Sequence, residues 1–189
     1  MFWYGILAFG VFLLHDLNCK SHNNERLLSL FPVGAGLLGL SILSQAQGGQ
    51  AALPAAVRII MGVLALFFLV LLVYTVFFAV QPKKQDRKKQ ASRPWWETPL
   101  VDTGVYALCR HPGVWWLCLM CLCLVPSTGF PLSSAVIYTL LDLILVWYED
   151  RYIFPHLIPG YEQYKKTTPF LFPNRTSARR CRETWRKKR

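Results

Sequence analysis

Two short polar sets stand at the edges of apolar runs, and their residue types are suited to binding a charged group. Arg110 and His111 come directly before an apolar stretch, within the sequence CRHPGVWW (109–116). Glu149 and Asp150 directly follow another apolar stretch. Charged side chains are costly beside hydrocarbon, so residues of this kind either anchor a helix at a membrane surface or hold a charged ligand.

A further acid lies inside an apolar run. Asp142 stands near the middle of the run that ends at Glu149. Glu149 is seven residues later and Tyr138 is one turn earlier, so the three side chains share one helical face. An acid at membrane depth is a functional candidate by default. A structural hydrogen bond between helices, or a neutralised acid, explains Asp142 equally well.

Membrane helices must position these residues, because the chain contains five apolar runs. The run at 57–80 holds 24 residues, and as a helix it extends about 36 Å, enough to cross a bilayer. The run at 114–125 is too short to cross alone, so it must begin earlier, through Pro112, or form half of a buried hairpin. Ala35 and Gly39 form a small-xxx-small face suited to close helix packing in lipid. We predict an all-α integral membrane protein with a single domain, 1–189, and five transmembrane segments, at about 2–16, 27–44, 57–80, 112–126 and 131–148.

The basic residues are concentrated in two segments. Of the 189 residues, 53% are hydrophobic and 16% are charged, and the formal net charge is +11; a soluble domain has about 25% charged residues. The segments 81–98 and 174–189 contribute +4 and +7, so the rest of the chain is neutral. Basic clusters beside apolar runs favour an anionic membrane surface over nucleic acid. We therefore expect the loop 81–98 and the basic tail 174–189 to bind anionic lipid, and we expect no nucleic-acid partner.

The positive-inside rule predicts the topology, because it places both basic segments in the cytoplasm. The C-terminus is then cytoplasmic, and counting helices back places the N-terminus outside. The last two membrane segments form a hairpin that brings Arg110 and His111 to the same membrane face as Glu149 and Asp150. This arrangement allows Arg110 to pair with Glu149. A compact five-helix form favours a bacterial inner membrane.

The six cysteines do not indicate a disulfide framework or a metal site. Cys118, Cys121 and Cys123 fall inside an apolar run, where cysteine acts as a small hydrophobic residue. No second pair of ligands accompanies them, so we expect no metal.

The polar sets also belong to a longer pattern. The stretch GVYALCRHPGVWW (104–116) resembles the G-x-Y-x-x-x-R-H-P-x-Y-x-G element of the isoprenylcysteine carboxyl methyltransferase family, whose relatives include bacterial membrane methyltransferases and phospholipid N-methyltransferases. In that family a helix ending in two acids comes next, followed by a Tyr-rich segment and a Pro-bounded stop. The stretch YEDRYIFPHLIPGYEQYKKTTPFLFP (148–173) stands in the same order. The resemblance therefore covers about 104–173.

The resemblance implies methyl transfer from S-adenosylmethionine, with the cofactor entering from the cytosol and a lipophilic acceptor entering from the bilayer. It implies a cofactor-binding region at 104–173. Carried over to this chain, it makes Arg110 and Glu149 the candidate catalytic residues. The candidate cofactor-binding residues are Tyr106, Arg110, His111, Pro112, Glu149, Asp150, Tyr161 and Tyr164.

The chain departs from the family pattern at three positions. Asp150 replaces the usual second Glu, Val114 replaces a Tyr, and Trp116 stands where the family has a small residue. Val114 and Trp116 are expected to reshape the pocket, and bulky Trp116 to narrow it. The acceptor therefore stays open among carboxylates, amines and thiols of lipophilic molecules.

The chemistry of the residues is compatible with this transfer. A sulfonium cation favours aromatic faces and a carboxylate. Arg110 is able to orient a carboxylate, of the acceptor or of the cofactor, through a bidentate pair. An amine acceptor would need a base, for which Glu149 and His111 are the candidates.

Two other functions remain open. Membrane steroid and sterol reductases have a similar C-terminal region and use NADPH. The phosphates of NADPH, however, would require more Lys and Arg at the site than this chain has outside its two basic segments. The other alternative is a non-catalytic membrane protein whose basic tail binds anionic lipid. We expect the methyltransferase.

Overall fold

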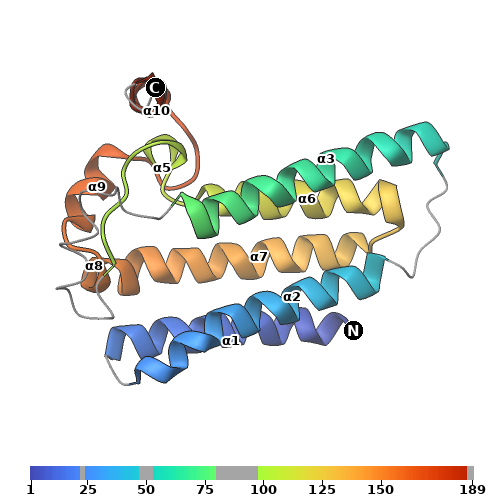
Figure 1. Cartoon of the computed structure of the whole chain (residues 1–189), viewed down its shortest axis with the longest axis horizontal. Helices are drawn as coiled ribbons and strands as arrows, with labels where there is room; N and C mark the ends of the chain where they lie inside the picture. Colours follow the sequence, from blue (N-terminus) through green and yellow to red (C-terminus); the bar gives the residue numbers. More distant parts are fainter. Residues whose placement is uncertain (22–23, 47–52, 80–97, 187–189) are drawn as a thin grey trace.

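The computed structural model describes residues 1–21, 24–46, 53–79 and 98–186, and the regular elements in these ranges are helices (Figure 1). The predicted all-α fold is thereby confirmed. Five long helices form a bundle: α1 (Phe2–Ser21), α2 (Leu30–Ala46), α3 (Ala55–Val73), α6 (Pro112–Thr128) and α7 (Leu132–Tyr148). The shorter elements are η1 (Glu25–Ser29), η2 (Tyr74–Phe78), α5 (Val105–Leu108), η3 (Glu149–Ile153), α8 (Phe154–Leu157), α9 (Tyr161–Thr167) and α10 (Arg175–Arg186).

Four continuous helical stretches are long and apolar enough to cross a membrane, which agrees with an integral membrane protein. The fifth apolar helix, α6, is shorter, at 17 residues, and begins at Pro112 as the sequence predicts. Proline suits this first helical position, because the missing N–H has no partner there in any helix. At its other end α6 stops at Gly129, whose φ of 75° is the left-handed conformation typical of a helix end. The four stretches are Phe2–Ser21, Glu25–Ala46, Ala55–Phe78 and Leu132–Leu157.

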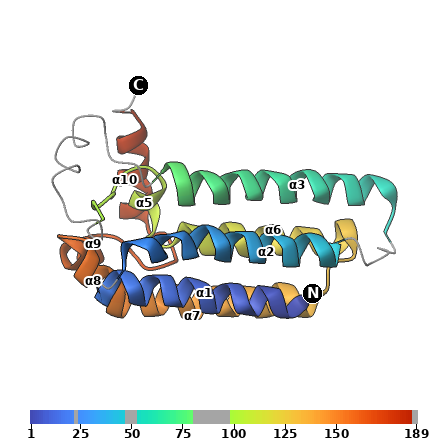
Figure 2. The same ribbon diagram turned by 60° about the horizontal axis from the view of Figure 1, so that its bottom comes forward.

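The bundle consists of two helix pairs joined by a central helix. Helix α1 packs along α2, α3 packs along α6, and α7 contacts both α6 and α1 (Figures 1 and 2). Consecutive long helices run in opposite directions, so α1, α3 and α7 end where α2 and α6 begin. The same end carries α5, α8 and α9, and we call it the loop-rich end; the N-terminus lies at the opposite end.

Tyr138 organises the packing near the N-terminus. Its side chain is fully buried, and its hydroxyl lies 2.7 Å from Ser41 Oγ, accepts a hydrogen bond from Gln45 Nε2 at 2.8 Å and lies 3.0 Å from the carbonyl oxygen of Phe2. Polar groups at membrane depth must be satisfied within the protein. Tyr138 therefore joins α1, α2 and α7 structurally, although it shares a helical face with Asp142.

The small residues of α2 do not act as the sequence predicts. A Cβ atom at Gly39 would meet no other atom within 4 Å, and both Gly39 and Ala35 line a cavity. The close helix contact is made by Gly34, where a Cβ would lie 2.7 Å from the ring of Phe12 on α1. The prediction that Ala35 and Gly39 form the packing face is therefore wrong by one position, since adjacent helical residues point about 100° apart.

Two of the long helices change to π-helix at the loop-rich end. Helix α3 continues as η2, and α7 continues as η3, which contains Glu149 and Asp150. A π-helical turn widens the helix and redirects the side chains that follow, and such turns are frequent at functional sites.

Candidate functional site

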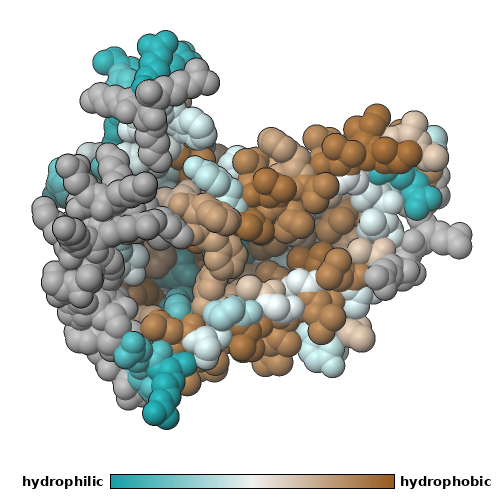
Figure 3. Space-filling view, viewed as in Figure 1, coloured by the Kyte–Doolittle hydropathy of each residue, from teal (hydrophilic) through white to brown (hydrophobic). Residues whose placement is uncertain are grey.

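A cavity of about 510 Å³ extends from the loop-rich end along the gap between α2 and α3. Figure 3 shows a recess on this face, with hydrophilic atoms at its base. Its volume lies within the range of about 300–1,000 Å³ that is usual for small-molecule sites. The part between α2 and α3 is lined by apolar residues that include Ala35, Leu38, Gly39, Ile42, Leu69 and Leu72. The polar lining gathers Asp16, Tyr106, Arg110, His111, Asp142, Glu149, Tyr161 and Tyr164.

Asp150 is the centre of a buried polar cluster beside this cavity. Its Oδ1 atom accepts a hydrogen bond from the Tyr161 hydroxyl at 2.7 Å and lies 3.3 Å from His111 Nε2. Arg110 approaches with two nitrogens, Nε at 2.9 Å from Oδ1 and Nη2 at 3.2 Å from Oδ2. The side chains of Arg110 and Asp150 are 9% and 11% exposed, so this ion pair is largely removed from solvent.

The pairing of Arg110 with Glu149 that the sequence suggested is therefore wrong, because the partner is Asp150. Neighbouring residues of the π-helical turn point in different directions, so only one of the two acids faces the guanidinium group. The remaining nitrogen, Nη1, donates to the carbonyl oxygen of Lys165 at 3.2 Å. Nη1 and Nη2 of Arg110 thus each donate to a protein acceptor, and Nε lies close to Asp150 Oδ1 without forming a hydrogen bond. These contacts make Arg110 a positioning residue for the cluster.

Backbone hydrogen bonds hold Arg110 and His111 against the segment that follows α9. Arg110 N donates to the carbonyl oxygen of Pro169 at 3.0 Å, and His111 N donates to that of Phe170 at 3.3 Å. The Trp115 indole donates to the carbonyl oxygen of Leu171 at 2.9 Å. The start of α6 and the segment 169–171 therefore form one unit beside the cavity.

Tyr106 is fixed from both sides. Its hydroxyl donates to the carbonyl oxygen of Thr75, in η2, at 3.1 Å, and its own carbonyl oxygen accepts from the Tyr164 hydroxyl at 2.6 Å. The Thr75 hydroxyl accepts from the Trp116 indole at 3.1 Å, and the Trp116 ring stacks on Phe68.

Trp116 does not narrow the cavity, contrary to expectation. It is absent from the lining, whereas Val114 belongs to it. Residues two positions apart on a helix point in nearly opposite directions, so only one of this pair faces the cavity. Of these two positions, only Val114 is placed to affect the shape of the cavity.

Three carboxyl groups face the cavity, and one of them was not predicted. Glu149 and Asp142 come from α7 and its π-helical extension, as the shared helical face indicates. Asp16 comes from α1 and lines the same cavity beside Glu149. The signal for Asp16 was present in the sequence, because it is an acid at the edge of an apolar run, as Glu149 is.

Burial favours the neutral forms of His111 and of three tyrosines in the site. It lowers the pKa of His111 below the usual 6.5, although Asp150 partly opposes this shift. Burial raises the pKa of the Tyr106, Tyr161 and Tyr164 hydroxyls, and for Tyr161 the hydrogen bond to Asp150 adds to the effect. These phenols therefore act as hydrogen-bond donors.

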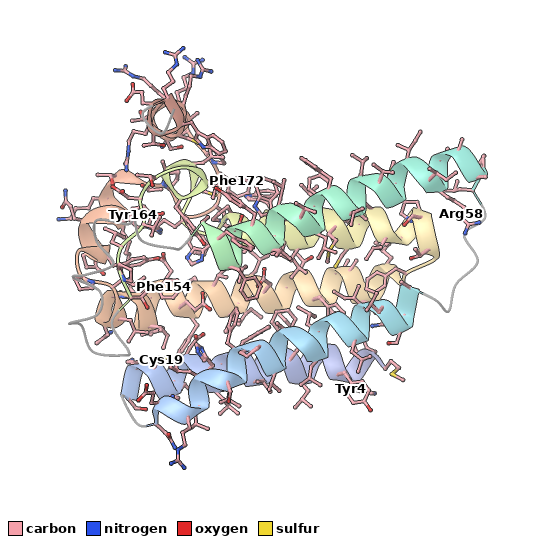
Figure 4. The ribbon with its side chains drawn as sticks, in the orientation of Figure 1. Tyr4, Cys19, Arg58, Phe154, Tyr164 and Phe172 are labelled. Carbon is pink, nitrogen blue, oxygen red and sulfur yellow. The ribbon has the colours of Figure 1, made fainter. Side chains whose placement is uncertain are left out.

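The predicted site residues converge at the loop-rich end, where Figure 4 labels Tyr164 and Phe154, far from Arg58 at the opposite end. Asp150 alone among them is not part of the cavity lining and acts through its partners. Of the predicted basic loop 81–98, only Thr98 lies within the described residues; the tail 174–189 is described to Arg186, as α10. The predicted site residues that line the cavity are Tyr106, Arg110, His111, Pro112, Glu149, Tyr161 and Tyr164.

No protein-family model, curated protein or solved structure matches the chain.

Proposed function

We propose that the protein transfers a methyl group from S-adenosylmethionine to a lipophilic acceptor at the membrane face of the loop-rich end. The observation that carries this proposal is a single cavity with two chemically different parts. One part presents carboxyl groups and tyrosines, and the other is an apolar channel between α2 and α3. A sulfonium cation is attracted by carboxylates and aromatic faces, and an apolar channel suits the hydrocarbon of an acceptor.

In this proposal Glu149 makes the direct polar contact with the cofactor. It lies in the cavity lining, whereas Asp150 is occupied by Arg110, His111 and Tyr161. Arg110 acts through Asp150 and the Lys165 carbonyl group, so it positions the site rather than binding a carboxylate of the ligand. Tyr106, Tyr161 and Tyr164 supply aromatic surface around the adenosine moiety.

The reaction itself requires mainly positioning. The acceptor's lone pair attacks the methyl carbon in line with the breaking carbon–sulfur bond, and the sulfonium leaves as a neutral thioether. A carboxylate acceptor requires no proton transfer, whereas a protonated amine must first lose a proton, for which Glu149 is the nearest candidate base. A cavity between packed helices excludes bulk water from this step.

The resemblance of 104–173 to the isoprenylcysteine carboxyl methyltransferase family supports the same proposal. The acidic lining also favours a sulfonium over a nicotinamide cofactor, whose phosphates require cations. Arg110 is the one Arg or Lys side chain among the described lining residues. Its guanidinium nitrogens face Asp150 and the carbonyl oxygen of Lys165 rather than the cavity.

The proposed orientation places the loop-rich end in the cytoplasm and the N-terminus outside. The described segments on either side of 80–97 end at Ala79 and begin at Thr98, and they lie at the loop-rich end together with α10 (Figure 1). The positive-inside rule then assigns this end to the cytoplasm. A bacterial inner membrane remains the predicted location.

Ligand binding in detergent tests the function. S-adenosylhomocysteine is expected to raise the thermal unfolding temperature of the wild-type protein, and NADPH is not. Glu149→Gln is expected to weaken the binding of S-adenosylhomocysteine by about tenfold, as for the loss of one charge-assisted hydrogen bond. Glu162→Gln is the matched control, because Glu162 is 67% exposed.

Stabilisation by NADPH, or by neither ligand, would contradict the proposal. If S-adenosylhomocysteine binds, transfer of a labelled methyl group into a total lipid extract identifies the acceptor class. Unchanged affinity in the double variant Arg110→Ala/Glu149→Ala would also exclude the site as described.

A further inference from the structure

Helix α10 begins at a well-defined cap and lies across the bundle. Asn174 Oδ1 accepts from Ser177 N at 2.8 Å, and Ser177 Oγ accepts from Asn174 N at 3.0 Å, which is a reciprocal capping arrangement. Figure 1 shows α10 end-on, and in Figure 2, turned about the long axis of the bundle, α10 runs from top to bottom. Both views place its axis across the long helices, parallel to the plane of a membrane that those helices cross.

One face of α10 is a stripe of arginines. Arg175, Arg179, Arg182 and Arg186 follow the spacing i, i+4, i+7 and i+11, so they share a face, and all four are exposed. Glu183 is the one acid of this helix, and it pairs with Arg179 at 2.9 Å. The stripe therefore carries a net positive charge along about 16 Å of helix.

The other face of α10 docks on the loops of the candidate site. The Thr184 hydroxyl accepts from Gly104 N, directly before α5, at 3.0 Å. Arg180 Nη1 donates to the carbonyl oxygen of Thr167, at the end of α9, at 3.1 Å. Arg180 Nη2 also lies 3.8 Å from Asp102 Oδ2, and Ser177 is fully buried.

These contacts connect α10 to the backbone of the site. Gly104 directly precedes α5, the short helix that contains Tyr106. Thr168 directly precedes Pro169 and Phe170, whose carbonyl oxygens accept hydrogen bonds from the backbone N–H groups of Arg110 and His111. A ligand that binds the docked form of α10 therefore stabilises the segment 104–111 as well, by mass action.

The position of α10 indicates what the arginine stripe binds. The helix packs against α5 at the loop-rich end and carries exposed Trp185 (Figure 1). Figure 4 places Phe172, which is 72% exposed, between α10 and the bundle. Exposed aromatics beside a basic helix face are typical of the membrane–water interface.

We propose that α10 binds anionic lipid headgroups on the membrane face that carries the cavity, and that this binding holds the segment 104–111 in its place beside α10. The arginine stripe supplies the charge, and the aromatic side chains set the depth at the interface. The proposal does not depend on the reaction proposed above, because it concerns only the surface and the segment docked beneath it.

Hydrogen exchange of the full-length protein in lipid nanodiscs tests this proposal. In nanodiscs with one third phosphatidylglycerol, the amides of α10 and of 104–111 are expected to exchange at least tenfold more slowly than in phosphatidylcholine alone. The variant Arg175→Gln/Arg182→Gln is expected to lose most of this difference. Lys20→Gln/Arg26→Gln removes the same charge elsewhere at the loop-rich end, and the difference should persist.

Three results would overturn the proposal. Equal exchange in neutral and anionic nanodiscs would exclude lipid binding by α10. Slower exchange confined to α10 would exclude the connection to 104–111. Equal slowing by an RNA oligonucleotide in neutral nanodiscs would show that the stripe binds polyanions generally, rather than the membrane surface.

Discussion

The neighbouring acids Glu149 and Asp150 have different environments although they differ by one position and one methylene group. Asp150 is held by Arg110, His111 and Tyr161, and it organises the segments around the cavity. Glu149 faces the cavity and Asp16. Asp150 is a structural group and Glu149 is available to a ligand, because neighbouring residues of the π-helical turn point in different directions.

Asp150→Asn is expected to destabilise the protein by about 3 kcal/mol, because it leaves the charge of Arg110 buried without a counter-ion. The measurement is the free energy of unfolding in detergent. Asp102→Asn is the matched control, since Asp102 is half-exposed and lies 3.8 Å from Arg180. That exposed pair is expected to contribute less than about 1 kcal/mol. Equal losses for the two variants would contradict the assignment of Asp150 as the organising residue.

The buried His111 predicts a loss of stability in mild acid. Its pKa lies below 6.5 in the folded protein, because burial outweighs the contacts with Asp150. Below pH 6.5 the unfolded chain therefore binds a proton that the folded chain does not. The free energy of unfolding is therefore expected to decrease as the pH is lowered below 6.5. This group contributes at most about 1.4 kcal/mol per pH unit.

Unfolding measured between pH 5.5 and 7 checks this prediction. His111→Gln is expected to flatten the dependence, because glutamine does not titrate. His156→Gln, at an exposed histidine, should leave the slope unchanged. An unaltered slope in His111→Gln would show that other groups cause it.

At the scale of elements, glycine positions decide how closely the helices approach. Gly5 of α1 lies against the ring of Tyr138. Hydrogen bonds to Phe2 on α1 and Ser41 on α2 hold the Tyr138 side chain in place. Gly10, on the same helix, has no atom within 4 Å of a Cβ position. The contact between α1 and α7 therefore depends on Gly5 and not on Gly10.

Gly5→Ala is expected to lower the free energy of unfolding by about 1–3 kcal/mol, because the new methyl group overlaps the ring of Tyr138 and forces the helices apart. Gly10→Ala is the matched control and is expected to be neutral, or stabilising by up to about 1 kcal/mol through helix propensity. Unfolding in detergent compares the two. A neutral Gly5→Ala variant would mean that Tyr138 moves aside easily.

At the scale of the whole molecule, the cavity exists because α2 and α3 pack on their own partners, α1 and α6, and leave an apolar channel between them. Gly39 lines this channel and Gly36, three residues earlier on α2, does not. A Cβ at either position meets no atom within 4 Å. The two glycines thus differ mainly in whether a side chain would point into the channel.

Gly39→Phe is expected to fill part of the channel. If the protein has the function proposed above, the variant should reduce methyl transfer by at least tenfold, through a higher KM for the acceptor. Stabilisation by S-adenosylhomocysteine should persist, because the polar part of the cavity is unchanged. Gly36→Phe is the matched control, on the exposed side of α2, and is expected to retain transfer. Equal activity of both variants would place the acceptor elsewhere.

The sequence predicted the elements well because apolar runs and their polar edges are local signals. The start of α6 at Pro112 and the convergence of Arg110 with the acids after α7 both followed from helix lengths and alternating direction. The first helix continues to Ser21, beyond the predicted end at residue 16, because a helix persists through polar residues where it leaves the apolar layer. Hydropathy marks the apolar layer and not the helix end.

The sequence by itself determined the membrane helices, their order and the polar residues that meet at one end of the bundle. Tertiary structure alone decided that Asp150 pairs with Arg110, that Gly34 makes the close contact on α2, and that Asp16 joins Glu149. Each of these outcomes depends on how a helix is rotated about its axis. A sequence pattern fixes the apolar and polar faces, but the rotation is set by the side chains of the neighbouring helices, since ridges on one helix must fit the grooves of the next.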